Sequence, residues 1–142
     1  MTATWPRCVA LWAGWSAGLN VAWEILQLPL YTIYESGPPA WMAFAVLHCT
    51  AGDVLIALAC YAAAACATRT ARWPLERPLF GLAIALPIGV AYTAFSEWLN
   101  VSVRGSWEYA AAMPRVYGIG LAPLLQWLLV PPAAVSLIRR AI

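Results

Sequence analysis

Charged residues are scarce in this sequence, and lysine is absent. The 142 residues include eight arginines, six acidic residues and one histidine, so charged side chains make up 10% of the chain. Soluble domains carry about 25% charged residues. The few basic residues lie between the apolar runs and form no stripe, so the net charge of +2 gives no sign of nucleic-acid binding, and we expect no nucleic-acid partner. The chain is also too short for two domains, and we expect a single domain, 1–142.

Cysteine pairs with metal-binding or redox spacing are also missing. None of the four cysteines forms a C-x-x-C pair, and haem held by two histidines is excluded because there is one histidine. The chain lacks the G-x-S-x-G, Walker and Rossmann glycine patterns. We therefore expect no metal and no cofactor. A carboxylate-rich metal site built from Glu24, His48 and Glu97 is the alternative.

Apolar residues are abundant instead. They make up 63% of the chain, with nine tryptophans and a mean hydropathy of +0.73, against about 45–50% apolar residues in soluble domains. Four apolar runs each have roughly the 20 residues that a helix needs to cross a bilayer. They cover residues 8–30, 41–66, 79–101 and 118–138. The sequence predicts an all-α fold, an integral membrane four-helix bundle whose first partner is the lipid bilayer.

The arginines set the orientation of this predicted bundle. The connection between the second and third runs carries three arginines and the C-terminus carries two more, whereas the first connection has none. The third connection has two arginines and one glutamate, which argues weakly for the opposite orientation. By the positive-inside rule, both termini are cytoplasmic. We expect a multi-pass protein of the bacterial inner membrane, with the first and third connections in the periplasm.

Polar side chains interrupt the first apolar run. Asn20, Glu24 and Gln27 lie at i, i+4 and i+7, so a helix presents all three on one face. A carboxylate inside the bilayer costs several kcal/mol, by ordinary estimates about 3 or more. This cost predicts that Glu24 has a partner or a chemical task.

Each of the other three runs brings a polar group to a similar depth. At a rise of 1.5 Å per residue, Glu24, His48, Glu97 and Gln126 lie roughly 6–12 Å inside the same side of the membrane. Asp53 lies deeper and about 140° around the helix from His48, so the two cannot both face one tight centre. His48 is therefore the better candidate for the central site. The convergence predicts a protonatable pocket in the periplasmic half of the bilayer.

Two groups of candidate residues follow from this convergence. The predicted catalytic residues are Glu24, His48, Asp53 and Glu97. The predicted substrate-binding residues are Asn20, Trp23, Gln27, Trp98, Asn100, Arg104, Trp107, Gln126 and Trp127. In a regular helix Arg104 lies seven residues after Glu97, so we expect its long side chain to fold back toward that carboxylate.

Two resemblances accompany these residues. The stretch Asn20-x-x-Trp23-Glu24 resembles membrane-bound terpene cyclases of the meroterpenoid type, which implies Glu24 as the acid that protonates a prenyl substrate and Glu97 or Asp53 as the second carboxylate. The whole chain, including His48-Cys-Thr-Ala-Gly-Asp53 and Ser96-Glu-Trp-Leu-Asn100, resembles a group of small four-helix bacterial inner-membrane proteins. This second resemblance implies no activity.

The leading functional prediction is a pocket that binds a lipophilic small molecule, an isoprenoid included, or acts on it by acid–base chemistry. As an enzyme the protein would be an isomerase or cyclase embedded in the membrane. The alternatives are a small proton-coupled transporter and a structural subunit whose polar groups are only interhelical hydrogen bonds. Small residues four apart, Gly14 and Gly18 among them, predict either packing within the chain or a homodimer.

Overall fold

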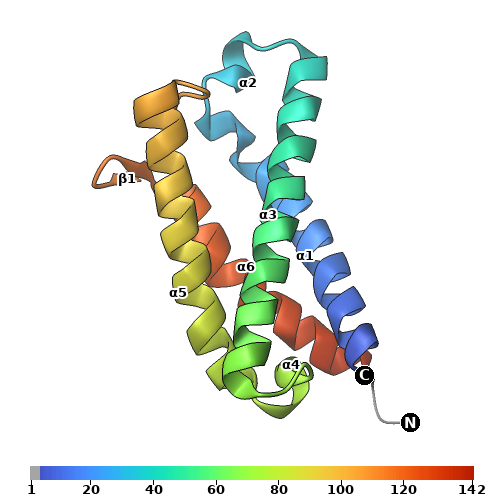
Figure 1. Cartoon of the computed structure of the whole chain (residues 1–142). Coiled ribbons are helices and arrows are strands. Elements are labelled where there is room, and N and C mark those ends of the chain that lie inside the picture. Colours follow the sequence, from blue (N-terminus) through green and yellow to red (C-terminus); the bar gives the residue numbers. More distant parts are fainter. Residues whose placement is uncertain (1–3) are drawn as a thin grey trace.

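A computed structural model describes residues 4–142, and most of them are helical (Figure 1). The elements in chain order are α1 (Trp5–Gln27), the 3-10 helix η1 (Leu28–Leu30), α2 (Ile33–Ser36), α3 (Pro39–Thr68), α4 (Trp73–Glu76), α5 (Pro78–Glu97), the π-helix η2 (Trp98–Arg104), β1 (Arg115–Val116), β2 (Ile119–Gly120) and α6 (Leu121–Ala141). The two short strands form a single antiparallel pair. The predicted all-α class is confirmed.

Three helices are long and apolar enough to cross a membrane. They are Pro39–Thr68, Pro78–Arg104 and Leu121–Ala141, which correspond to the second, third and fourth apolar runs of the sequence. The chain therefore has the helices of a membrane protein. Helix α1 is not in this set, although its 23 residues extend about 34 Å. A fourth crossing by α1 stays a prediction.

The four long helices pack in a closed ring. Helix α1 packs on α3, α3 on α5, α5 on α6, and α6 returns to α1. The start of α1, the end of α6 and the connection through α4 lie together at one end of the molecule, at the bottom of Figure 1. The Arg7 side chain near the N-terminus donates a hydrogen bond of 3.2 Å to the carbonyl of Ala141 near the C-terminus. The inward faces of the ring consequently meet along one axis.

An aromatic cluster fills the ring near α4. Trp12 of α1 packs against Tyr61 of α3 and Trp73 of α4, with ring centroids 5.6 and 5.3 Å apart. The Trp12 indole N–H donates a 2.9 Å hydrogen bond to the carbonyl of Ala57. Cys8 and Cys60 are buried in the same core, with free thiols, as small packing residues.

Two glycines of α5 let large indoles pack closely against its backbone. A Cβ at Gly81 would lie 1.9 Å from Trp73, and a Cβ at Gly89 would lie 2.0 Å from Trp127. Both distances are far below van der Waals contact, so only glycine fits. These contacts fix how closely α4 and α6 approach α5.

The segment 105–120 folds over the opposite end of the bundle. The π-helix η2 stops at Gly105, whose φ of +63° is the left-handed conformation that favours glycine. The segment then pairs with the chain that follows α1. The Thr32 N–H donates to the carbonyl of Glu108 at 3.0 Å, and the Ala110 N–H donates to the carbonyl of Leu30 at 2.9 Å. The long connection is thereby fastened to the end of α1.

The stripe of small residues on α1 faces outward. Gly14 and Gly18 are exposed, and a Cβ at either glycine would meet no atom within 4 Å. Packing within the chain is therefore the wrong interpretation of this stripe. The homodimer stays a prediction.

Candidate functional site

The polar residues of α1 lie on its inward stripe. Cys8, Trp12, Ser16 and Asn20 are buried at intervals of four residues, and Gln27 continues the same face. Glu24 occupies the next position on this stripe and is half-buried. The stripe faces α3 and α6, because those are the helices on which α1 packs. The predicted common face of Asn20, Glu24 and Gln27 is thus present and directed into the bundle.

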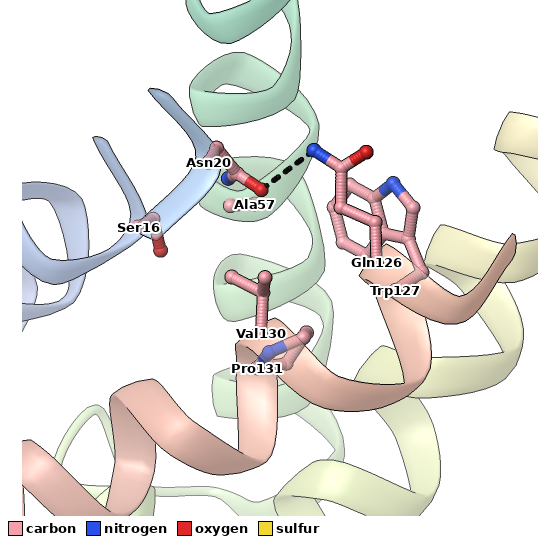
Figure 2. A pocket seen from close by; sticks show the side chains of 7 residues that line it. All are labelled: Ser16, Asn20, Ala57, Gln126, Trp127, Val130 and Pro131. Atoms are coloured by element: carbon pink, nitrogen blue, oxygen red, sulfur yellow. Dashed lines mark hydrogen bonds between the residues drawn. The ribbon is translucent and has the colours of Figure 1, made fainter. Parts of the chain in front are cut away.

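One amide nitrogen connects this stripe to two other helices. Gln126 of α6 is buried, and its Nε2 donates to Asn20 Oδ1 at 2.9 Å, to Asp53 Oδ2 at 2.8 Å and to Glu24 Oε1 at 3.3 Å. Glu24 Oε1 also accepts from Gln27 Nε2 at 2.9 Å. Figure 2 shows the bond from Gln126 to Asn20, with the two side chains reaching toward each other from α6 and α1. The network joins α1, α3 and α6.

Two carboxyl groups are neighbours in this network. Glu24 and Asp53 accept from the same nitrogen and lie close enough to interact directly. Within the described residues the one ion pair joins Arg72 to Glu76, so no arginine neutralises either carboxyl. Two carboxylates this close repel each other in a medium of low polarity. The arrangement therefore requires a proton or a cation between them.

The sequence-based preference for His48 over Asp53 is reversed. His48 is exposed on α3, its ring stacks on Phe44 with centroids 5.5 Å apart, and it makes no side-chain hydrogen bond in residues 4–142. The buried Ala57 marks the inward face of α3, and His48 lies about 180° from it around the helix, whereas Asp53 lies only about 40° away. The preference rested on depth, which fixes height in the bilayer but not direction around the helix.

A second polar centre surrounds Glu97, which is buried. The hydroxyl of Tyr109 donates a 2.5 Å hydrogen bond to Glu97 Oε2. The side chains of Tyr31 and Trp107 approach the same carboxyl, and the buried Trp107 indole nitrogen has no hydrogen-bond partner among the described residues. Glu97 also lies near enough to Glu24 for their charges to interact. The two centres are adjacent parts of one polar region.

Tyr109 keeps its proton at neutral pH. Burial raises the pKa of its hydroxyl above the ordinary value, and the hydrogen bond to Glu97 raises that pKa further. Its ring packs on Tyr31 with centroids 5.6 Å apart and carries the Arg115 guanidinium at 5.3 Å from its centroid. Tyr109 is therefore a fixed donor toward Glu97, with a cation on its ring.

A pocket of about 400 Å³ opens beside this tyrosine. Its volume falls in the range of about 300–1,000 Å³ that small-molecule sites occupy. It is lined by Val101, Gly105, Trp107, Glu108, Tyr109 and Arg115. The pocket combines aromatic surface with charges of both signs, and its Tyr109 wall leads directly to Glu97.

A cavity inside the bundle is, by contrast, very small. It measures about 10 Å³, the space of roughly one water molecule. Its lining is Ser16, Asn20, Ala57, Gln126, Trp127, Val130 and Pro131 (Figure 2). A lipophilic molecule has no room in this small cavity, whereas the pocket beside Tyr109 is large enough to hold one.

Three residues of the π-helix lie away from the place predicted for them. Arg104 is exposed and makes no ion pair in the described part of the chain. The wider π turn changes the direction of side chains seven residues apart, so the expected approach of Arg104 to Glu97 fails. Trp98 is 50% exposed and packs beside Phe95 on the outer surface. Asn100 donates to the Ser96 carbonyl at 2.9 Å and serves its own helix.

The two remaining predicted tryptophans differ in their surroundings. Trp127 is buried against Gly89 and lines the small cavity. Trp23 is half-buried, and its indole nitrogen has no hydrogen-bond partner within residues 4–142. Trp127 therefore belongs to the packing of α5 against α6.

The sequence-based candidates omit four residues of these centres. Thr50 lies one turn before Asp53 on α3, a spacing that is visible in the sequence. Tyr31, Tyr109 and Arg115 come from segments outside the four apolar runs, and their meeting depends on how the long connection folds. A buried tyrosine in a connection has no periodic pattern to mark it.

The described residues contain no group of three or more histidine, cysteine or acidic side chains placed to hold a metal ion. No family model, curated protein or solved structure matches the chain. The geometry of the two polar centres and the pocket therefore carries the functional argument.

Proposed function

We propose that this chain is an integral membrane protein that binds a small amphipathic molecule under segment 105–120 and exchanges a proton with it. The observation that carries the proposal is the hydrogen bond from Tyr109 to Glu97. It connects a buried carboxyl to the wall of a pocket that is large enough for a small molecule.

All four long helices cross the membrane in this proposal. Helix α1 packs on two helices that have the length and apolar character of spans, and a helix held between them shares their environment. Six of the eight arginines lie at the start of α1, at the end of α6 or in the connection around α4, and these three parts share one end of the molecule (Figure 1). They are Arg7, Arg69, Arg72, Arg77, Arg139 and Arg140. By the positive-inside rule this end is cytoplasmic in a bacterial inner membrane, and the pocket faces the periplasm.

The ligand carries an anionic end and a lipophilic body. Arg115 supplies a positive charge at the pocket, and its guanidinium is held over the Tyr109 ring. Trp107 and Val101 supply apolar surface, and the neighbouring bilayer supplies a route for a lipophilic molecule. Isoprenoids with a charged or polar head belong to this chemical class.

Glu97 acts as the base in this site. Tyr109 already donates to Glu97, so a proton leaving the ligand passes to the Tyr109 oxygen while the phenolic proton passes to Glu97. The ligand becomes an anion, and the Arg115 guanidinium stabilises the new charge. This is the proton abstraction that begins an isomerisation.

Mass spectrometry of the natively extracted protein tests the proposal. We expect a co-purified small molecule other than bulk phospholipid, retained by wild type and lost from Arg115→Leu. Tyr109→Phe should keep the ligand in unconverted form, because the hydroxyl that relays the proton is missing. Tyr117→Phe is the matched control, since Tyr117 is fully exposed on the same segment. Recovery of bulk phospholipid alone from wild type would contradict the proposal.

Proton-coupled transport is the second candidate function. The network of Glu24, Asp53 and Gln126 supports it, because it places neighbouring carboxyls between three helices of a small membrane bundle. Flux measurements in proteoliposomes with Glu24→Gln separate the candidates. Transport by wild type that the substitution abolishes would favour the transporter.

A further inference from the structure

Two buried oxygen atoms, one in the network around Glu24 and one on α3 a turn before Asp53, have no hydrogen-bond partner within residues 4–142. Gln27 is 6% exposed and Thr50 is 9% exposed. Neither Gln27 Oε1 nor Thr50 Oγ1 has a hydrogen-bond partner in the part of the chain that the structure describes. The Gln27 amide lies inside the network, because its Nε2 donates to Glu24 at 2.9 Å. A buried oxygen without a partner costs about 1–3 kcal/mol.

Hydrogen atoms are too few for the acceptors that meet here. Gln126 Nε2 has two hydrogens and three oxygens within 3.3 Å. Those oxygens belong to Asn20, Glu24 and Asp53. Gln27 Oε1 belongs to an amide that bonds Glu24, and Thr50 lies on α3 one turn before Asp53. The site is therefore rich in oxygen and poor in positive charge.

We propose that this oxygen-rich site binds one small hard cation of the sodium or calcium kind. Such ions bind carboxylate, amide and hydroxyl oxygens, about six to eight for calcium, and need no histidine or cysteine. The ligands are oxygens of Asn20, Glu24, Gln27, Thr50 and Asp53. Gln126 Nε2 now lies among three of them, and a half-turn of its amide presents Oε1 to the ion instead.

The cavity next to this network is too small for an organic ligand. The adjoining cavity measures about 10 Å³ and has Asn20 and Gln126 in its wall (Figure 2). That volume admits one water or an ion without its hydration shell, and no organic ligand.

A proton alone satisfies the site less well. A proton between Glu24 and Asp53 relieves their repulsion but bonds only those two carboxyls. It leaves Gln27 Oε1 and Thr50 Oγ1 unpartnered. A cation contacts several oxygens at once, which is what this arrangement of side chains offers.

Thermal unfolding of the detergent-purified protein tests the inference, with its tryptophans as the fluorescent reporters. Sodium chloride, calcium chloride and choline chloride are compared at equal ionic strength. We expect sodium or calcium to raise the unfolding midpoint by several degrees, with saturation, because a ligand that binds only the folded state stabilises it. The cation that does so identifies the ion.

Two variants show whether the stabilisation arises at this site. Thr50→Val and Gln27→Met each remove one oxygen, and we expect them to weaken the response to the cation at least tenfold in the concentration required. Thr93→Val is the matched control, because Thr93 is a buried threonine on α5 outside the network. It should keep the full response.

The same midpoint in sodium, calcium and choline would overturn the proposal, as would an undiminished response in Thr50→Val and Gln27→Met. Should either variant fail to fold, equilibrium dialysis of wild type with radioactive sodium or calcium decides the question. One bound ion per chain supports the site, and no stoichiometric binding refutes it. None of these measurements depends on the pocket beside Tyr109, so this inference and the proposed function fail separately.

Discussion

Among single residues, Gln126 has the largest structural role in the polar region. A buried amide stabilises a membrane bundle only when its hydrogen-bond partners are equally buried. Its Nε2 bonds α1 and α3 from α6, and three acceptors depend on it. Interhelical hydrogen bonds in membranes average about 0.6 kcal/mol, but acceptors left without a donor cost more.

Replacing Gln126 with leucine should therefore lower the free energy of unfolding by about 2–3 kcal/mol. The reason is that Asn20, Glu24 and Asp53 lose their shared donor while remaining enclosed. Chemical denaturation in detergent, followed by circular dichroism, measures the change. Leu129→Ala on the same helix is the control, because Leu129 is exposed and should change stability little. Equal stability of Gln126→Leu and wild type would show that the network contributes nothing.

The sequence locates these residues by depth but leaves their directions open. The shared face of Asn20, Glu24 and Gln27 follows from spacing alone, and it is present in the structure. The depths of His48 and Asp53 are both compatible with the site, so depth does not show which of the two faces it. That choice requires the buried face of α3, which the structure supplies. The hydrogen bond between Tyr109 and Glu97 could not be predicted from sequence periodicity, because it joins a connection to a helix.

Among the helices, α5 is distinguished by the close packing of tryptophan side chains that two of its glycines allow. The indoles of Trp73 and Trp127 occupy the places where side chains at Gly81 and Gly89 would stand. The approach is close because α5 offers bare backbone at those two turns. The same helix ends in a π turn, so its last residues point in directions that a regular helix would not give.

Gly89→Ala should destabilise the protein by about 1–3 kcal/mol, because an added methyl in a filled site forces side chains or backbone to move. The new Cβ would lie 2.0 Å from the Trp127 ring. Gly52→Ala on α3 is the matched control. A Cβ there meets nothing within 4 Å, and alanine favours the helix by about 1 kcal/mol. Thermal unfolding in detergent should therefore shift in opposite directions for the two variants, and a shift in the same direction would contradict this packing.

Helix positions were more predictable from the sequence than helix ends. The apolar runs 41–66, 79–101 and 118–138 correspond to α3, α5 with η2, and α6. The sequence does not predict that the third run continues as a π-helix to Arg104, because hydrophobicity reports burial and not the hydrogen-bond register. The short helix α4 depends on Trp73 filling the core, which is a tertiary contact.

The whole molecule has an uneven distribution of charge along its length. Six arginines lie at the end that holds α4 and the start of α1, whereas Arg104 ends η2 and Arg115 begins β1, elements toward the opposite end. A bilayer with anionic lipid on its cytoplasmic side favours one orientation of such a molecule. The predicted topology rests on this asymmetry.

Cysteine labelling in intact cells tests that orientation. Tyr117→Cys should react with a membrane-impermeant maleimide, because Tyr117 is fully exposed at the end proposed as periplasmic. Arg69→Cys, in the connection before α4, should react only after the cells are opened. Both substitutions are made with Cys66 changed to serine, since Cys66 is the exposed native thiol. The reverse labelling pattern would place the pocket in the cytoplasm.

The bridge between Tyr31 and Tyr109 ties segment 105–120 to the chain that directly follows α1, so a movement of one is passed to the other. Helix α1 carries Glu24, and the segment carries the tyrosine that bonds Glu97. An ion that bound beside Glu24 and shifted α1 would therefore also displace the pocket wall. Equilibrium thermodynamics would then demand reciprocity: the ion would change the affinity of the pocket by the same factor by which the pocket's ligand changed the affinity for the ion.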